Sequence, residues 1–186
     1  MITKYLSKIY FKLSGWKTVG SIPKDIKKCI IIGAPHTSNW DFIYARFALY
    51  IFDYKIRYLI KDSMFKNPIA GWFFRVTGGI PVNRSKNTNL TGDLAQLLKT
   101  ADMLYLAIPP EGTRNRADHW KTGFYRIAIE CNIPVALAFL DYKKRQAGFI
   151  KIFYPTGNMS EDFKLIQSFY SPEMAANPDK YNPEIL

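Results

Sequence analysis

The chain has 186 residues, of which 48% are hydrophobic and 16% aromatic, and its net charge is +11. This length suits one domain with a substantial core. The positive charge favours an anionic partner: nucleic acid, a membrane surface, or a phosphorylated or acyl-carrier substrate. Cys29 and Cys131 lie far apart in no ligand spacing, which excludes a disulfide scaffold and a structural zinc site and fits a reducing compartment.

Residues 1–28 carry seven lysines and one aspartate, which is over half of the net charge. Apolar residues recur there at helical spacing, and lysines occupy another face: Ile2, Leu6, Ile9, Tyr10 and Leu13 on the first, Lys4, Lys8 and Lys12 on the second. This pattern predicts a basic amphipathic helix, a shape suited to lying on anionic bilayers. A helix packed on the domain with a solvated lysine stripe fits equally well, so both interpretations stay open.

Apolar runs in this chain are too short to predict a transmembrane helix, which needs roughly 18 uninterrupted apolar residues. The best stretch, residues 42–52, contains Arg46. Lysines at positions 4, 8 and 12 interrupt any signal-peptide core. We therefore expect an intracellular protein with peripheral membrane contact.

From residue 29 onward, strand-like and helix-like segments alternate. In chain order the pattern predicts a strand at 29–32, a helix at 39–52, a strand at 56–60, a helix at 65–75, a strand at 79–82, a helix at 90–98, a strand at 103–108, a helix at 123–130, and strands at 135–140 and 149–154. Asn158 and Glu161 form a capping box for a closing helix, and the last 16 residues look irregular. The alternation predicts one α/β domain whose largely parallel or mixed central sheet is flanked by helices.

His36 and Asp41 are the most informative pair in the chain, because His36 is one of only two histidines. A histidine held by a carboxylate is a common general base near neutral pH. Residues five apart point away from each other within a helix. We therefore expect His36 in the loop before the predicted helix and Asp41 in its first turn, with Ser38 or Asn39 as the helix cap.

Two further polar clusters follow predicted strands, where ligands bind in open α/β sheets. Residues 78–84 end on Arg84, whose planar guanidinium suits a phosphate, although a surface arginine after a glycine turn is as consistent. The next predicted strand is followed by a second polar cluster, Glu111, Gly112, Thr113 and Arg114. This cluster can bind a polyol phosphate, with Arg114 at the phosphate and with Glu111 and Thr113 at the hydroxyls. The second histidine, His119, has no suitable carboxylate, and we expect it at the surface.

These blocks, in this order, resemble those of the glycerolipid acyltransferase superfamily, specifically the bacterial lysophospholipid (1-acylglycerol-3-phosphate) acyltransferases. His36 and Asp41 match the HX4D block, Gly78 and Arg84 the second block, Glu111 to Arg114 the EGTR block, and Ile133, Pro134 and Val135 the fourth. The resemblance covers roughly residues 29–140. It leads us to divide the chain into a basic amphipathic segment, 1–28, and an acyltransferase domain, 29–186.

The resemblance implies transfer of a fatty acyl group from a thioester, on coenzyme A or acyl carrier protein, to the hydroxyl of a lysolipid. His36 would be the base and Asp41 its orienter, while Arg84 and the loop from Glu111 to Arg114 would hold the acceptor. No cofactor or metal is expected. The expected partners are the acyl donor, the lysolipid and an anionic membrane surface, with no nucleic acid, at the inner face of the cytoplasmic membrane.

Two alternatives remain at this stage. A thioesterase or lipid hydrolase would use the same histidine and aspartate on water, and would release free fatty acid without an acceptor. A non-enzymatic basic protein that binds membrane or nucleic acid is favoured by charge and aromatic content alone, and it would bind in a salt-sensitive way without needing His36.

Overall fold

A seven-stranded sheet forms the centre of the molecule, in the order β1-β7-β6-β2-β5-β3-β4. The computed structural model describes residues 2–83 and 89–186. Its strands are β1 (Lys17–Val19), β2 (Lys28–Ala34), β3 (Ile56–Lys61), β4 (Gly79–Val82), β5 (Leu104–Ala107), β6 (Val135–Asp141) and β7 (Gln146–Phe153). Every neighbouring pair is parallel except β6 and β7, which are antiparallel. The predicted α/β domain with a mixed central sheet is confirmed.

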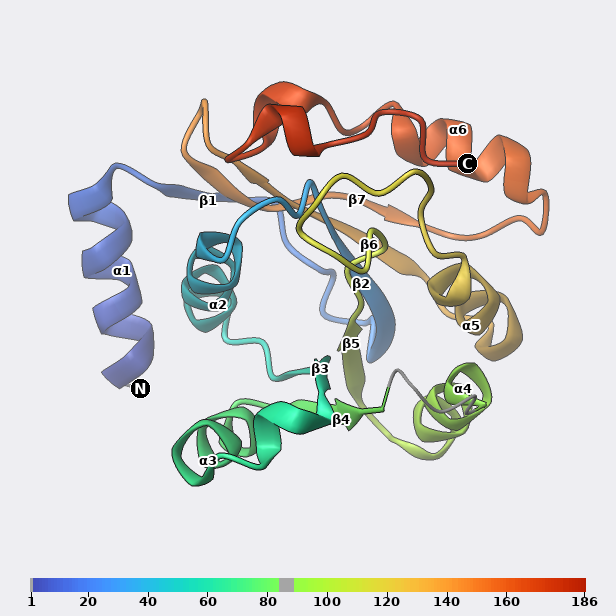
Figure 1. Cartoon of the computed structure of the whole chain (residues 1–186), viewed down its shortest axis with the longest axis horizontal. Coiled ribbons are helices and arrows are strands. Elements are labelled where there is room, and N and C mark those ends of the chain that lie inside the picture. The colour runs from blue at the N-terminus through green and yellow to red at the C-terminus, as the bar shows by residue number, and fades with distance from the viewer. Residues whose placement is uncertain (1, 84–88) are drawn as a thin grey trace.

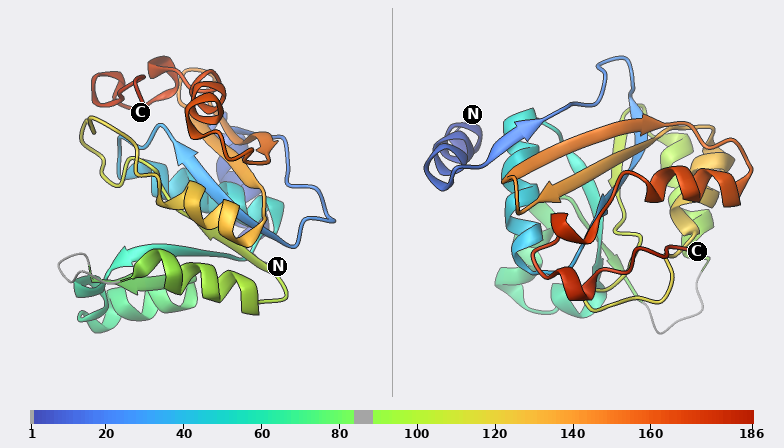
Figure 2. Two further views of the ribbon diagram at one scale, coloured as in Figure 1. Left: turned by 90° about the vertical axis from the view of Figure 1, so that its right-hand side faces the viewer. Right: turned by 90° about the horizontal axis from the view of Figure 1, so that it is seen from above.

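The helices of the described chain cover the two faces of the sheet in separate groups (Figure 1). One face carries α1 (Ile2–Ser14), α2 (Trp40–Phe52) and α3 (Pro68–Val76). The other carries α4 (Leu90–Thr100), α5 (Gly123–Cys131) and α6 (Met159–Gln167). Short 3-10 helices lie at Asp62–Phe65, Pro172–Met174 and Pro178–Lys180. The left view of Figure 2 brings α4 and α5 to the front, with the sheet behind them.

Buried side chains on both faces of β2 explain why its sequence is a continuous apolar run. Ile30 and Ile32 pack under α4, α5 and α6, whereas Cys29 and Ile31 join the core under α2 and α3. Successive side chains of a strand point to opposite faces, so a strand buried on both faces shows no polar alternation. This burial fixes β2 in the middle of the sheet, and its carboxyl end delivers the chain to His36.

The N-terminal segment packs on the rest of the molecule. Phe11 and Ser7 of α1 are buried, and Trp16 packs with Ala48 of α2. β1 then pairs with β7 at the sheet edge. This three-residue strand was not predicted, because three residues are too few to show a period. The division of the chain at residue 28 stays a prediction.

The last 16 residues are irregular apart from two 3-10 turns, yet they are not a loose tail. Tyr181 and Ile185 are fully buried, and the Trp120 amide donates to the Ile185 carbonyl. In Figure 1 this segment and the loop after β5 run side by side along the same end of the sheet. Within residues 2–83 and 89–186, none of the helices has the length and apolarity to cross a bilayer.

Candidate functional site

His36 and Asp41 meet at the carboxyl end of β2. The strand ends at Ala34, a cis peptide bond joins Ala34 to Pro35, and His36 lies in the loop before α2. Asp41 is in the first turn of that helix, and its Oδ2 lies 3.1 Å from His36 Nδ1. The predicted contact is therefore present. Of the two predicted cap residues, Asn39 precedes the helix but its side chain makes no capping bond, whereas Ser38 Oγ accepts a 3.2 Å hydrogen bond from the amide of Trp40, the first residue of α2.

The Asp41 carboxylate is buried and surrounded by donors. Its Oδ2 accepts hydrogen bonds from the backbone amides of Thr37 (2.8 Å) and Ser38 (2.9 Å) as well as from the His36 ring. Its Oδ1 accepts a 2.7 Å bond from the Tyr142 hydroxyl. A buried carboxylate is costly unless such donors satisfy it. These bonds fix the carboxylate against the ring and place the proton on His36 Nδ1.

The orientation of the His36 ring leaves Nε2 as the nitrogen that can meet a substrate. The side chain is 24% exposed, whereas that of Asp41 is only 6% exposed. A neutral imidazole with a proton on Nδ1 is a proton acceptor at Nε2. Chemically, the pair can therefore remove a proton from a hydroxyl or a water and stabilise the imidazolium that results.

Tyr142 is a member of this cluster that sequence reasoning missed. It follows β6, and its ring lies edge-on to Trp16 (5.2 Å between centroids) and to Tyr44 (5.7 Å). Burial, and then its hydrogen bond to Asp41, raise the pKa of the Tyr142 phenol well above its ordinary value, so it remains a donor. The one signal that could have found it is its place after a strand parallel to β2, whose end lies at the same edge of the sheet.

Glu111 fixes the loop that carries His36 through a hydrogen bond. Its Oε1 accepts a 3.0 Å hydrogen bond from the His36 backbone amide, and its side chain is buried. The pKa of Glu111 is raised to about 7, chiefly by burial; the hydrogen bond from the His36 amide opposes this rise, and the negative charge of Asp41 adds to it. Glu111 follows β5, the neighbour of β2, so the adjacency of these two strands brings the first and third sequence blocks together.

The rest of the EGTR block leads outward from Glu111. Gly112 has a positive φ of 67°, a backbone conformation that favours glycine, and a Cβ added there would also displace the Lys121 side chain, whose Cε would lie 2.8 Å away. Thr113 and Arg114 are exposed, and Thr113 Oγ1 accepts from the Asn115 amide. His119 is exposed as predicted. Arg84 lies outside the described residues.

The C-terminal segment holds the opposite side of the His36 loop. The Asn177 amide donates to Thr37 Oγ1 (3.1 Å), and its side-chain Nδ2 donates to the Thr37 carbonyl (2.9 Å). Thr37 is itself buried. The loop that carries His36 is thus fixed by Asp41, five residues along the chain, and by two residues from distant parts of the sequence, Glu111 and Asn177.

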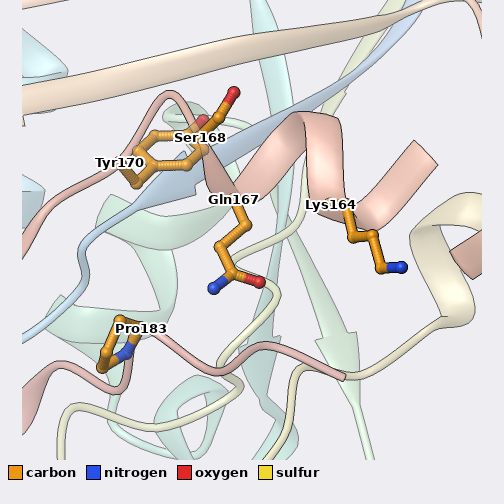
Figure 3. Close-up of a pocket in the computed structure, with 5 residues that line it drawn as sticks. All are labelled: Lys164, Gln167, Ser168, Tyr170 and Pro183. Carbon is orange, nitrogen blue, oxygen red and sulfur yellow. The ribbon is translucent and has the colours of Figure 1, made fainter. Parts of the chain in front are cut away.

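Two surface hollows lie away from this cluster. One, of about 340 Å³, lies between α6 and the C-terminal segment, where Figure 3 shows Gln167 projecting from the helix into the space before Pro183, while Lys164 points away from Pro183. The other, of about 490 Å³, lies between α1 and β1 and is lined by Lys8, Lys12 and Lys17 over an apolar floor of Phe11, Trp16 and Ile51. Among the described residues, no group of three or more histidine, cysteine or acidic side chains is arranged to hold a metal.

Comparison with known proteins defines the class to which this fold and cluster belong. The acyltransferase family model matches residues 18–137, which is more than half of the chain. The chain therefore belongs to the acyltransferase family, and the resemblance to the glycerolipid acyltransferase superfamily is confirmed. The match begins at β1 and ends within β6, so it contains His36, Asp41 and Glu111.

Two individual relatives are named for the same activity. The chain is 29% identical over 143 residues to the 1-acyl-sn-glycerol-3-phosphate acyltransferase of Haemophilus influenzae, a match that covers 73% of this chain and 58% of that protein. It is 35% identical over 107 residues to 1-acyl-sn-glycerol-3-phosphate acyltransferase epsilon of Mus musculus, covering 55% of this chain and 29% of the relative. The chain thus spans between about a third and three fifths of the length of these relatives.

A solved structure supports the same fold. The crystal structure of the 1-acyl-sn-glycerophosphate (LPA) acyltransferase, PlsC, from Thermotoga maritima superposes with a TM-score of 0.65 at 19% identity. The match covers 90% of this chain and 74% of that chain. The two chains therefore share the fold over most of the length of this one.

Proposed function

We propose that the chain is an O-acyltransferase that moves a fatty acyl group from an acyl thioester to the hydroxyl of a lysophospholipid or a related lipid alcohol. The observation that carries this proposal is the His36–Asp41 pair, 3.1 Å apart at a strand end in a chain of the acyltransferase family. The relatives named for 1-acyl-sn-glycerol-3-phosphate favour that lysolipid as the acceptor. The donor is an acyl thioester of coenzyme A or acyl carrier protein.

In the proposed reaction His36 acts as a general base through Nε2. It takes the proton of the acceptor hydroxyl as that oxygen attacks the thioester carbonyl, and Asp41 stabilises the imidazolium that forms. The tetrahedral intermediate then collapses, the carbon–sulfur bond breaks, and the leaving thiolate takes the proton from His36. The acyl group passes directly from sulfur to oxygen, so the reaction needs no covalent acyl-enzyme and no cofactor beyond the donor.

The acceptor is proposed to bind at the loop after β5. Arg114 is exposed there and offers a guanidinium to the acceptor phosphate. Glu111, Gly112 and Thr113 border the same loop and are proposed to face the glycerol, with Glu111 also fixing the His36 amide. Arg84 is proposed as a second phosphate ligand on sequence grounds.

An anionic membrane surface is the proposed setting, at the inner face of the cytoplasmic membrane. The outer side of α1 exposes the apolar residues Ile2, Tyr5, Leu6, Ile9 and Leu13. Next to them, the lysine-lined hollow between α1 and β1 offers cationic groups to lipid phosphates. Helix α1 is therefore both packed on the domain through Phe11 and suited to bilayer contact, which unites the two interpretations of its sequence.

Product analysis tests the proposed reaction class. The purified protein is incubated with a radiolabelled acyl thioester, with and without lysophosphatidic acid, and the lipids are separated. We expect labelled phosphatidic acid that appears only when the acceptor is present. Free fatty acid released at the same rate without an acceptor would identify a hydrolase instead, and intact thioester in every mixture would favour a binding protein.

A further inference from the structure

The surface of α3 has an apolar stripe that faces solvent. Ile69, Trp72, Phe73 and Val76 lie at positions i, i+3, i+4 and i+7, which is the spacing of one helix face. Three of these side chains are largely exposed: Ile69 at 79%, Trp72 at 64% and Val76 at 62%. A stripe of this kind normally faces a core. We call these four residues the outer stripe of α3.

The fold itself turns this stripe outward. Gly71 is the buried residue of α3, and a Cβ there would lie 2.7 Å from the Phe65 carbonyl oxygen. The helix therefore approaches the molecule closely on its glycine side, where Phe74 also packs on the core. Because Gly71 and Phe74 fill the inner side, Ile69, Trp72 and Val76 of the outer stripe stay largely exposed, and only Phe73, at its edge, packs on a neighbouring ring of the described chain.

Exposed apolar residues are distributed unequally between the two faces of the sheet. Helices α1 and α3, on one face, each expose a stripe, and Trp40 and Ile43 at the start of α2 add to that side. On the other face, α4, α5 and α6 expose one large apolar residue each, namely Leu97, Ile129 and Leu165. Scattered single residues are normal on a soluble surface, whereas stripes indicate a partner.

The charge around α3 indicates which partner fits. Residues 55–77 hold one acidic side chain, Asp62, against five exposed basic ones: Lys55, Arg57, Lys61, Lys66 and Arg75. Basic side chains beside an exposed tryptophan and aliphatic residues match the interface of an anionic bilayer, where indole rings lie at headgroup depth. Phe73 links this surface to the candidate site, since its ring lies 6.3 Å from that of Phe42, the neighbour of Asp41.

We propose that the outer stripe of α3 is a second membrane-docking element, which inserts Ile69, Trp72 and Val76 into the headgroup region of an anionic bilayer. This inference rests on the membrane contact proposed above and is independent of acyl transfer. Docking through both α1 and α3 would place the start of α2, and with it the His36 loop, beside the surface from which a lysolipid arrives.

Vesicle flotation tests this inference with a matched pair of double variants. Ile69→Ser/Val76→Ser removes two exposed side chains of the outer stripe, while the control Ile129→Ser/Leu165→Ser removes two exposed apolar residues from the opposite face. Vesicles contain phosphatidylcholine alone or with phosphatidylglycerol. We expect the outer-stripe variant to bind the anionic vesicles about tenfold more weakly than wild type, because two aliphatic side chains lose their burial in lipid. The control should bind like wild type.

Equal binding of wild type and the Ile69→Ser/Val76→Ser variant would overturn the inference, and so would equal weakening by both double variants. A wild-type dimer in gel filtration that becomes monomeric in the outer-stripe variant would identify a second copy as the occupant instead. Acyl transfer to a short-chain, monomeric acceptor is measured on the same proteins. Loss of vesicle binding with no transfer even in wild type would contradict the proposed function and leave docking supported.

Discussion

Asp41 is the residue through which the candidate site is organised. Its carboxylate accepts hydrogen bonds from the nearby backbone amides of Thr37 and Ser38. It also accepts one from the hydroxyl of Tyr142, which lies 101 positions away in the sequence. The local contacts could be predicted, because loop and helix geometry constrain residues five apart. The Tyr142 contact could not be predicted from spacing, since it depends on how β6 lies beside β2. The same holds for Asn177, which reaches Thr37 across 140 positions.

Replacing Tyr142 by phenylalanine tests whether its hydroxyl positions the pair. The ring stays in its contacts with Trp16 and Tyr44, and only the bond to Asp41 is lost. A hydrogen bond to a charged group is worth about 1.5–3 kcal/mol, so we expect kcat to fall roughly tenfold or more. KM for the acceptor should not change, because Tyr142 is a positioning residue that does not touch the acceptor.

Tyr44→Phe is the matched control, since it removes a hydroxyl from the neighbouring ring while the Tyr142 hydroxyl that donates to Asp41 is kept. Its kcat should equal that of wild type. If Tyr142→Phe lowers only the stability and leaves the kcat of the folded enzyme unchanged, Tyr142 is structural and not a positioning residue.

Glu111 gives the protein a distinctive dependence of stability on pH. Its pKa is raised from 4.5 to about 7 in the folded state, chiefly by burial. The folded state therefore holds the Glu111 proton more tightly than the unfolded chain does. Its contribution to stability is complete below pH about 4.5 and is lost as the pH rises through about 7, a change of about 3 kcal/mol.

Glu111→Gln should remove this loss, because glutamine stays neutral and keeps an oxygen that can accept from the His36 amide. Urea unfolding at pH 5 and pH 8 measures the effect. We expect the variant and wild type to be about equally stable at the lower pH and the variant to be more stable at the higher one. A stability difference that does not change between these pH values would show that Glu111 is ionised throughout.

At the scale of elements, the sequence predicted helices and strands best where a segment is long enough to show its hydrophobic period. Helices α2, α4 and α5 and strands β3, β4 and β6 lie within a few residues of their predicted bounds. β1 was missed because it has three residues and depends on its pairing with β7. The pairing of β6 with β7 as antiparallel neighbours follows from the short turn at residues 142–145, which leaves no room for a crossover.

The C-terminal segment contributes buried side chains to the core although its sequence is irregular. Its prolines predicted an irregular segment, and the segment holds two three-residue 3-10 turns, yet Ile185 is fully buried beneath the loop after β5. Ile185→Ala should therefore destabilise the protein by about 3 kcal/mol, as large-to-small changes in a core do. The matched variant Leu186→Ala, at a position that is half exposed, should change stability by less than about 0.5 kcal/mol.

Urea unfolding monitored by circular dichroism compares these two variants. Equal effects would show that the C-terminal segment is not part of the cooperative core. A large effect of Ile185→Ala together with a fall in activity is also expected, because Asn177 of the same segment bonds to Thr37 in the His36 loop.

At the scale of the whole molecule, the sheet separates two kinds of surface. One face carries α1 and α3, whose outer sides are apolar and basic, and the other carries helices with ordinary polar surfaces. The His36 loop, Glu111 and Tyr142 converge at the carboxyl end of parallel strands between them. This convergence follows from the strand order, which no single block of sequence contains, and it explains why distant blocks form one site.

The central claim is that His36 removes the proton of a lipid hydroxyl during acyl transfer. The most direct test compares the rate of phosphatidic acid formation by purified wild type, His36→Ala and His119→Ala, the last of these replacing the exposed second histidine. We expect His36→Ala to be about 10³-fold slower or more, as for loss of a general base, with unchanged folding and vesicle binding, and His119→Ala to match wild type. A folded His36→Ala enzyme with a rate near that of wild type would contradict the account.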